Sequence, residues 1–212
     1  LPEVTHVKHG LILGEDSKKL KTRGGAAILL EDVLAQSIER AAKVVGEKRP
    51  DLSVAERKKI AHAVGIAALK YNDLSQNRQS DIAFDWDKML NFEGNSAPYL
   101  MYTYARLKSI LRKAKIGRLD VAVLGKPELD LVFALSRFPD VVLGASQDYF
   151  PNHLADYLYQ LAGQANAFYH AHPVLKAEPK HLRDARLYLV AAVAQTLKTG
   201  LGLLGIPVLE KM

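Results

Sequence analysis

The chain has 212 residues, 49% of them hydrophobic, which allows one or two domains with a buried core. Lysine and arginine outnumber aspartate and glutamate by 29 to 23, and the resulting net charge of +6 suits a polyanionic partner such as nucleic acid. The absence of cysteine excludes disulfides and thiolate metal sites. Because no apolar run is long enough for a membrane span and no signal-peptide pattern opens the chain, we expect a soluble protein of the cytoplasm.

The first 25 residues contain a short strand and a basic loop. Since the chain does not begin with methionine, we expect that a preceding part of the natural protein lies outside it. Residues 5–14 are predicted to form a strand and turn, in which His6 and His9 are interpreted as strand or surface histidines. The loop at residues 15–25 ends in two glycines, and its cations are Lys18, Lys19, Lys21 and Arg23. Taken alone, such a cluster favours a solvated turn.

Two helices are predicted to follow this loop. Apolar residues repeat at spacings of three and four over residues 29–45, and we expect Gly46 and Pro50 to end that helix. Ser53 and Glu56 form the pattern of a capping box for a second helix that runs to residue 71. Gly65 inside the second helix indicates close packing against a neighbour.

Polar residues and one tryptophan occupy the next segment. Asn72, Asn77 and Arg78 either form a solvated loop or contact backbone phosphates, and the two interpretations are equally supported. After them, Asp85 is predicted to cap a short helix at which Phe84 and Trp86 anchor the junction. Core packing is the favoured role of Trp86 over base stacking, because tryptophan is highly buried on average.

The stretch at residues 91–115 carries a helix with two different faces. Ser96 is a good N-cap and Pro98 suits a first helical turn, so the sequence predicts a helix over residues 97–114. One face is an apolar stripe of Leu100, Tyr104, Leu107 and Leu111. The other face carries Tyr99, Tyr102, Arg106, Ser109 and Lys113. Aromatic rings beside cations are the groups that bind unpaired nucleotides, so this second face predicts contact with single-stranded RNA.

The remaining sequence predicts further helices joined by short loops, and therefore a bundle. A helix begun by Pro127 is expected to turn Leu129, Val132, Phe133 and Ser136 to one face. A short helix after Phe138 precedes one opened by Pro151, with a long apolar stripe that ends at Phe168 and Tyr169. The last helix spans residues 179–203, with Gly200, Gly202 and Gly205 expected to end it. His170, His172 and His181 lack the spacing of a metal site, so none is predicted.

At residues 92–114 the sequence FEGNSAPYLMYTYARLKSILRKA closely resembles the start of the anticodon-binding domain of arginyl-tRNA synthetases. Two further segments agree with this resemblance, DLSQNRQSDIAFDWDKML at residues 73–90 and LKTGLGLLGIPVLEKM at residues 197–212. The resemblance covers nearly the whole chain and implies the carboxy-terminal portion of a longer synthetase. It implies a mostly α protein, in which a helical anticodon-binding bundle follows a short remnant of an α/β nucleotide-binding domain. The expected parts are a catalytic tail at 1–25, a connecting helical region at 26–90 and the bundle at 91–212.

The resemblance also assigns roles to the basic loop. It implies that residues 15–25 are a degenerate form of the second signature loop of class I synthetases, with Lys19 and Lys21 catalytic and Lys18 and Arg23 beside them at ATP. Mobile ammonium groups would meet the negative charge that builds on the phosphates of ATP in the transition state. His6 and His9 are not interpreted as the first signature, His-Ile-Gly-His, which belongs far upstream. Arginine activation, with L-arginine, ATP and Mg²⁺, is therefore expected only of the full-length enzyme.

The implied partner is tRNA(Arg), and a monomer is expected. The residues implied to bind the tRNA are Tyr99, Tyr102, Arg106, Lys113, Tyr169, Met212, Asn77 and Arg78. Met101 and Thr103 depart from the more usual glutamine and alanine of the family, and both are expected to lie off the binding face. Two alternatives stay open: a free-standing tRNA-binding module without catalysis, and an α-helical protein-interaction domain without an RNA partner.

Overall fold

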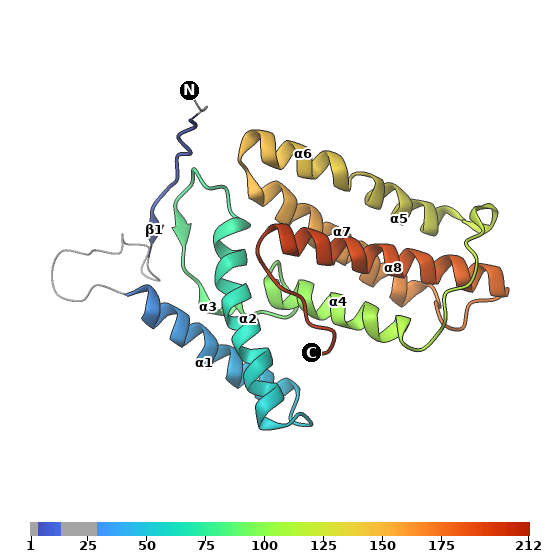
Figure 1. The fold of residues 1–212 in the computed structure, drawn as a ribbon, viewed down its shortest axis with the longest axis horizontal. Helices are drawn as coiled ribbons and strands as arrows, with labels where there is room; N and C mark the ends of the chain where they lie inside the picture. Colours follow the sequence, from blue (N-terminus) through green and yellow to red (C-terminus); the bar gives the residue numbers. More distant parts are fainter. Residues whose placement is uncertain (1–3, 14–28) are drawn as a thin grey trace.

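The computed structural model describes residues 4–13 and 29–212, and this part of the chain is mostly α-helical (Figure 1). The basic loop with Lys18, Lys19, Lys21 and Arg23 lies outside the described residues. The elements are β1 (Ile12–Leu13), α1 (Leu30–Lys48), α2 (Val54–Leu74), β2 (Ile82–Ala83), α3 (Trp86–Met89), α4 (Ala97–Leu111), the 3-10 helix η1 (Val121–Val123), α5 (Lys126–Ser136), α6 (Phe138–Asp148), α7 (Pro151–Ala171) and α8 (Lys180–Leu203). Among the helices described, none has the length and apolar character needed to cross a membrane.

The first helix runs farther than its sequence predicts. Gly46 lies inside α1, which continues to Lys48, so the expectation that Gly46 ends the helix was wrong. The backbone leaves the helical region at Arg49, the residue before Pro50, because the proline ring clashes with a helical conformation there. The proline therefore decides the end of α1.

Helix α2 begins with the predicted capping box and packs closely on α1. The Ser53 hydroxyl accepts from the amide of Glu56 at 3.3 Å, and the Glu56 carboxylate accepts from the amide of Ser53 at 3.0 Å. A side chain at Gly65 would lie 2.9 Å from the backbone of Ile38, and the Ser37 hydroxyl donates to the Gly65 carbonyl at 2.9 Å. The close approach expected from Gly65 is confirmed.

The strands β1 and β2 join the start of the chain to the segment that follows α2. They pair in parallel, with Ile12 opposite Ile82, and the amide of Phe84 donates to the carbonyl of Leu13 at 3.1 Å. Trp86 is buried against the edge of Phe84, as predicted for a core residue.

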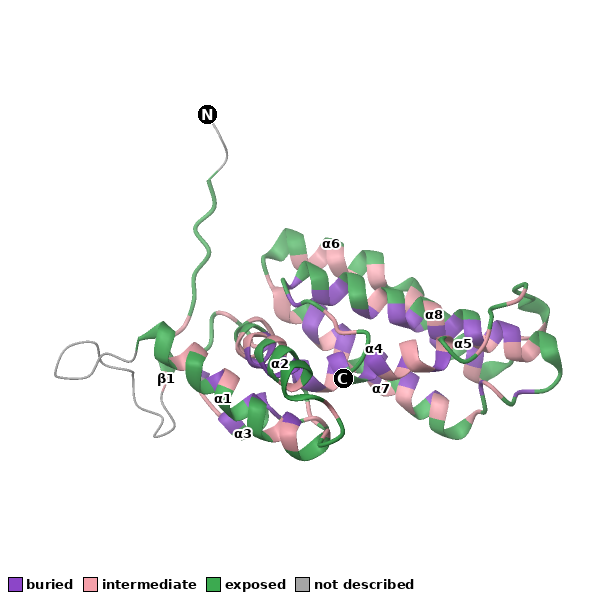
Figure 2. Ribbon diagram, turned by 60° about the horizontal axis from the view of Figure 1, so that its bottom comes forward, coloured by how far each residue is buried: buried purple, intermediate pink, exposed green. Residues whose placement is uncertain are grey.

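The bundle is built around α4, α7 and α8, with α5 and α6 on its outer side (Figure 1). Buried residues lie where these helices face one another (Figure 2). Ser96 caps α4 as predicted, and the apolar stripe of this helix enters the core. Among the largest fully buried side chains are Leu100, Leu107, Leu158, Leu161, Leu187 and Leu197. The bundle expected from the sequence is confirmed.

Helix α5 turns the opposite face to the core from the one predicted. Leu129, Val132 and Phe133 are exposed, whereas Leu131, Ala134 and Glu128 are buried. The Arg186 guanidinium of α8 donates to the Glu128 carboxylate at 2.8 Å, which compensates for burial of that charge. This ion pair orients α5, and the apolar pattern of the helix could not reveal it.

The glycines near the end of α8 have separate roles. Gly200 and Gly202 lie inside the helix, contrary to prediction, and a side chain at Gly200 would lie 2.5 Å from Leu158. Gly200 therefore permits contact between α8 and α7. Gly205 has a φ of +68°, a left-handed conformation that favours glycine, and the chain leaves the helix there.

Candidate nucleic-acid interface

A hollow of about 520 Å³ lies where the corner between α1 and α2 meets α4, α7 and the end of the chain. It brings together four residues predicted to bind tRNA, which are Tyr99, Tyr102, Arg106 and Met212. These residues come from two segments that are more than a hundred positions apart in sequence. The carboxy-terminal tail brings Met212 to the residues of α4, since it runs from the end of α8 back across α4 (Figure 1).

Of the two predicted tyrosines, Tyr99 and Tyr102, Tyr102 is the more exposed. The residue is 39% exposed, and its ring lies edge-on to Phe92 with centroids 6.4 Å apart. The guanidinium carbon of Arg106 lies 4.9 Å from the centroid of the Tyr102 ring, and Arg106 donates to the Tyr102 hydroxyl at 3.4 Å. Ring and cation therefore form one surface, as expected for residues one helical turn apart.

Tyr99 contributes less of its ring to the hollow. It is half-buried against the core, and its ring meets the edge of Tyr159 at a centroid distance of 5.5 Å. Its hydroxyl accepts from the side-chain amide of Asn166 at 3.0 Å. The ring of Tyr99 is largely engaged in packing, so Tyr102 is the better stacking surface of the two.

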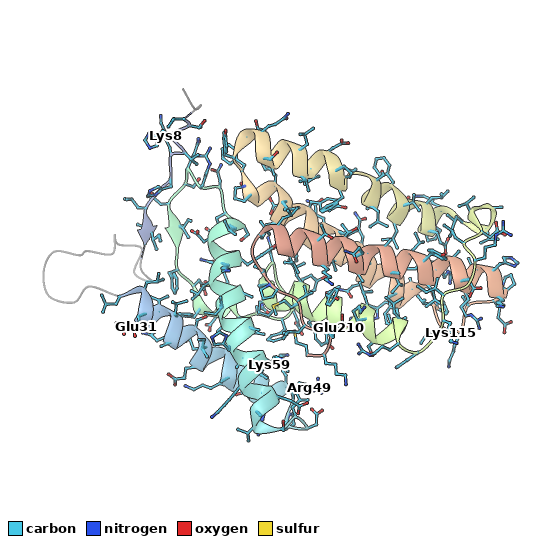
Figure 3. The ribbon with its side chains drawn as sticks, viewed as in Figure 1. Lys8, Glu31, Arg49, Lys59, Lys115 and Glu210 are labelled. Carbon is cyan, nitrogen blue, oxygen red and sulfur yellow. The ribbon has the colours of Figure 1, made fainter. Side chains whose placement is uncertain are left out.

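The tail that carries Met212 is anchored at several points. Glu210 accepts from the Tyr104 hydroxyl at 3.0 Å and forms an ion pair with Lys108 at 3.5 Å. A guanidinium nitrogen of Arg49 donates to the carbonyl of Met212. Glu210 lies beside α4, and Arg49 lies at the corner between α1 and α2 (Figure 3). These contacts hold Met212 in the wall of the hollow.

Three pKa shifts follow from the contacts around the tail and its anchor at Arg49. Burial and the hydrogen bond to Glu210 raise the pKa of Tyr104 to about 12, so this phenol stays protonated at neutral pH. The side-chain hydrogen bond with Asp51 raises the pKa of Arg49 and lowers the pKa of the Asp51 carboxyl. Arg49 therefore remains a cation at the rim of the hollow.

Several residues of the hollow were not predicted from the sequence. Lys48 lies with its ammonium nitrogen 5.4 Å from the centroid of the Phe92 ring, forming a second pairing of a cation with an aromatic ring. Arg49, Asn166 and His170 also line the hollow. Lys48 is the last residue of α1 and Arg49 caps this helix, and their place in the surface depends on how α1 packs on α2, which in turn packs on α4. No local pattern in the sequence marks that arrangement.

Thr103 was expected to lie off the binding face, and that expectation was wrong. It is buried and lines the hollow, and its hydroxyl accepts from the amide of Asn166 at 3.1 Å. Met101 is fully buried and does not line the hollow, so its expected place off the face is confirmed.

Two predicted tRNA-binding residues lie apart from the hollow. Lys113 is exposed in the turn after α4, seven residues beyond Arg106 and so about 10 Å farther along the helix axis. Tyr169 is half-buried against the core, and its neighbour His170 lines the hollow in its place. Neither residue belongs to the surface formed by Tyr102 and Arg106.

Arg78 and Asn77 also lie elsewhere, in the turn after α2. Arg78 donates to the carbonyls of Tyr149 at 2.8 Å and Lys8 at 2.6 Å, and its guanidinium carbon lies 4.3 Å from the centroid of the Phe150 ring. Asn77 accepts from the amide of Gln79 at 3.0 Å and is exposed. The contacts of Arg78 favour a structural role, because they tie the start of the chain to the end of α6.

Comparisons with known proteins find two matching family models and several similar relatives. The DALR anticodon binding domain model matches residues 100–212, and the model of the catalytic domain of class I tRNA synthetases (R) matches residues 1–86. The arginine–tRNA ligase of Chromobacterium violaceum is 46% identical over 212 residues, covering 99% of this chain and 37% of the relative. That of Laribacter hongkongensis is 49% identical over 211 residues, covering 98% and 36%.

A solved structure is similar over the same span. The arginyl-tRNA synthetase of Thermus thermophilus superimposes with a TM-score of 0.88 at 35% identity, covering 96% of this chain and 35% of that protein. The chain thus spans little more than a third of the length of the relatives that it matches.

Proposed function

The chain belongs to the arginyl-tRNA synthetase family, with the DALR anticodon binding domain at residues 100–212, and from this membership we propose that it binds tRNA(Arg) through the anticodon loop. The observation that carries the proposal is the hollow in which the exposed Tyr102 ring, the Arg106 guanidinium and Met212 meet. A volume of about 520 Å³ falls within the range of sites that hold small organic groups.

The chemistry of the hollow suits an unpaired nucleotide. Tyr102 and Phe92 offer flat rings on which a base can stack, and Lys48, Arg49 and Arg106 offer positive charge to the phosphates. Met212 adds an apolar contact at the end of the tail. In this proposal stacking holds the base while the cations hold the backbone of the loop.

The wider proposal is that the chain contributes to arginine–tRNA ligase activity in a longer protein. There, Lys19 and Lys21 would act on ATP with Mg²⁺, and L-arginine would be joined to tRNA(Arg). The residues proposed to contact ATP lie outside the described part, and the first class I signature does not occur in the sequence. We therefore expect no aminoacylation by these 212 residues alone. Cytoplasmic location and a monomeric state belong to the same proposal.

The test is binding of a labelled anticodon stem-loop of tRNA(Arg). Loss of the Tyr102 ring in Tyr102→Ala should weaken binding by roughly 1–3 kcal/mol, the worth of one stacked base, while Tyr102→Phe keeps most of the affinity. Fluorescence anisotropy measures the affinity, and the urea midpoint shows that the variants are folded.

Tyr188 supplies a matched control. It is 40% exposed on α8, about as much as Tyr102 at 39%, but does not line the hollow. Tyr188→Ala should leave RNA binding unchanged. Equal affinities for wild type and Tyr102→Ala would contradict the assignment of stacking to Tyr102, and no binding by the wild type would favour a protein-interaction domain instead.

A further inference from the structure

One side chain of α7 holds together the part of α4 that faces the hollow. The amide nitrogen of Asn166 donates to the Tyr99 hydroxyl at 3.0 Å and to the Thr103 hydroxyl at 3.1 Å. Its carbonyl oxygen accepts from the Arg106 guanidinium at 3.4 Å. Both N–H groups and the oxygen of this amide are thus directed at α4.

The contacts continue from Asn166 to the exposed ring. Arg106, which donates to Asn166, also donates to the Tyr102 hydroxyl at 3.4 Å and lies against the face of that ring. An unheld arginine samples many rotamers, and ordering it on binding costs conformational entropy. Because Asn166 and Tyr102 both hold the Arg106 guanidinium, this side chain loses less conformational entropy when RNA binds.

We propose that Asn166 is a positioning residue for RNA recognition, which fixes Arg106 and Tyr99 in the geometry that the anticodon loop meets. This inference rests on the proposed function of the hollow. Asn166 acts through Arg106 and Tyr99 and not by touching a base, because its amide groups are already directed at α4. The Thr103 hydroxyl gives this amide one of its acceptors.

The experiment measures binding of the anticodon stem-loop of tRNA(Arg) and of the same stem-loop with its loop bases exchanged. Asn166→Ala should weaken binding of the first RNA roughly three- to thirtyfold, the effect of one or two hydrogen bonds. It should also lower discrimination, which is the ratio of the affinities for the first and the second RNA. Gln164→Ala is the matched control, because Gln164 is an exposed amide two residues away that lines a different hollow, between α5 and α7. It should change neither affinity nor discrimination.

A double-mutant cycle separates positioning from simple packing between helices. If Asn166 acts through Arg106, Asn166→Ala should have little further effect on binding in an Arg106→Ala background. Additive effects on binding would overturn the inference. Tyr99→Phe removes only the hydroxyl that accepts from Asn166, so it should narrow discrimination even if Asn166→Ala proves unstable in urea.

The outcomes distinguish this inference from the proposed function. If the wild type binds the stem-loop and both Asn166→Ala and Tyr99→Phe keep its affinity and discrimination, the role of Asn166 is overturned and the proposed function is unaffected. Failure of the wild type to bind the stem-loop overturns both.

Discussion

Two cations each lie against an aromatic ring at the hollow. Arg106 lies against Tyr102 one turn earlier on the same helix, whereas Lys48 reaches Phe92 from the end of a different helix. The first pairing follows from a spacing of four residues, and the second depends on the packing of α1 on α2 and of α2 on α4. At the scale of single residues, both pairings present charge and a flat ring, the two groups that the proposed contact with a nucleotide requires.

We predict that Lys48 and not Lys113 meets the RNA backbone. Each phosphate contact to a single strand adds about 0.7 to the slope of log affinity against log salt concentration, because bound counterions are released. Lys48→Ala should therefore lower this slope by about that amount and weaken binding at low salt. Stem-loop titrations between low and moderate salt measure the slope.

Lys113→Ala is the control for this measurement, since it also removes one exposed lysine, and Lys113 was predicted to bind RNA but does not line the hollow. We expect its salt slope to match that of the wild type. A lowered slope for Lys113→Ala alone would show that the backbone of the RNA runs along the far end of α4.

At the scale of elements, the hairpin of α1 and α2 provides one wall of the hollow and includes a close approach between the two helices. Gly65 of α2 lies against the backbone of Ile38 in α1, and backbone atoms cannot rotate aside as a side chain can. The corner that follows carries Lys48 and Arg49 to the rim. Packing between α1 and α2 therefore sets the position of the charges at the end of α1.

We predict opposite effects for two glycine-to-alanine variants in this hairpin. Gly65→Ala should lower the free energy of unfolding by about 1–3 kcal/mol, because the added carbon would lie 2.9 Å from Ile38. Gly46→Ala places its carbon where no atom lies within 4 Å, so it should raise the free energy of unfolding by about 0.5–1 kcal/mol through improved helix propensity. Urea denaturation measures both, and a stabilising Gly65→Ala would mean that the two helices can separate at little cost.

At the scale of the whole molecule, three buried phenols join elements that are distant in sequence. Tyr71 of α2 donates to the carbonyl of Ala155 in α7 at 3.1 Å, Tyr104 of α4 donates to Glu210 in the tail, and Tyr157 of α7 donates to Ala134 of α5 at 3.0 Å. Burial raises the pKa of each phenol, to about 12 for Tyr104 and Tyr157. These groups tie the hairpin, the bundle and the tail together in their protonated form.

We predict that the protein loses stability in strong alkali. The pKa of Tyr104 and of Tyr157 is about 12 in the folded protein and about 10 in the unfolded chain. The contribution of each phenol to the free energy of unfolding is therefore complete below pH 10 and is lost as pH rises through 12. The urea midpoint should therefore stay level below about pH 10 and fall above it. Tyr104→Phe should show a shallower fall, and a midpoint independent of pH up to 12 would contradict this role of the phenols.

Local patterns predicted the starts of helices and placed three residues of the candidate site, Tyr99, Tyr102 and Arg106, on one helix face. Ser53 and Ser96 cap the helices that follow them because capping depends on residues within one turn. Tyr102 and Arg106 share a face because four residues complete a turn. The same reasoning was wrong at α5, where Leu129 and Leu131 lie on alternative apolar faces and the buried pair of Glu128 with Arg186 selects between them.

The sequence by itself determined which segments become helices and which side chains share a face of α4, since both depend on contacts within a few residues along the chain. Only the tertiary structure decided that Met212, Lys48 and Asn166 join Tyr102 and Arg106 around one hollow and that Lys113, Tyr169 and Arg78 do not. The physical reason is that packing between helices, set by close contacts such as Gly65 on Ile38 and by ion pairs such as Glu210 with Lys108, brings together residues that no local pattern relates.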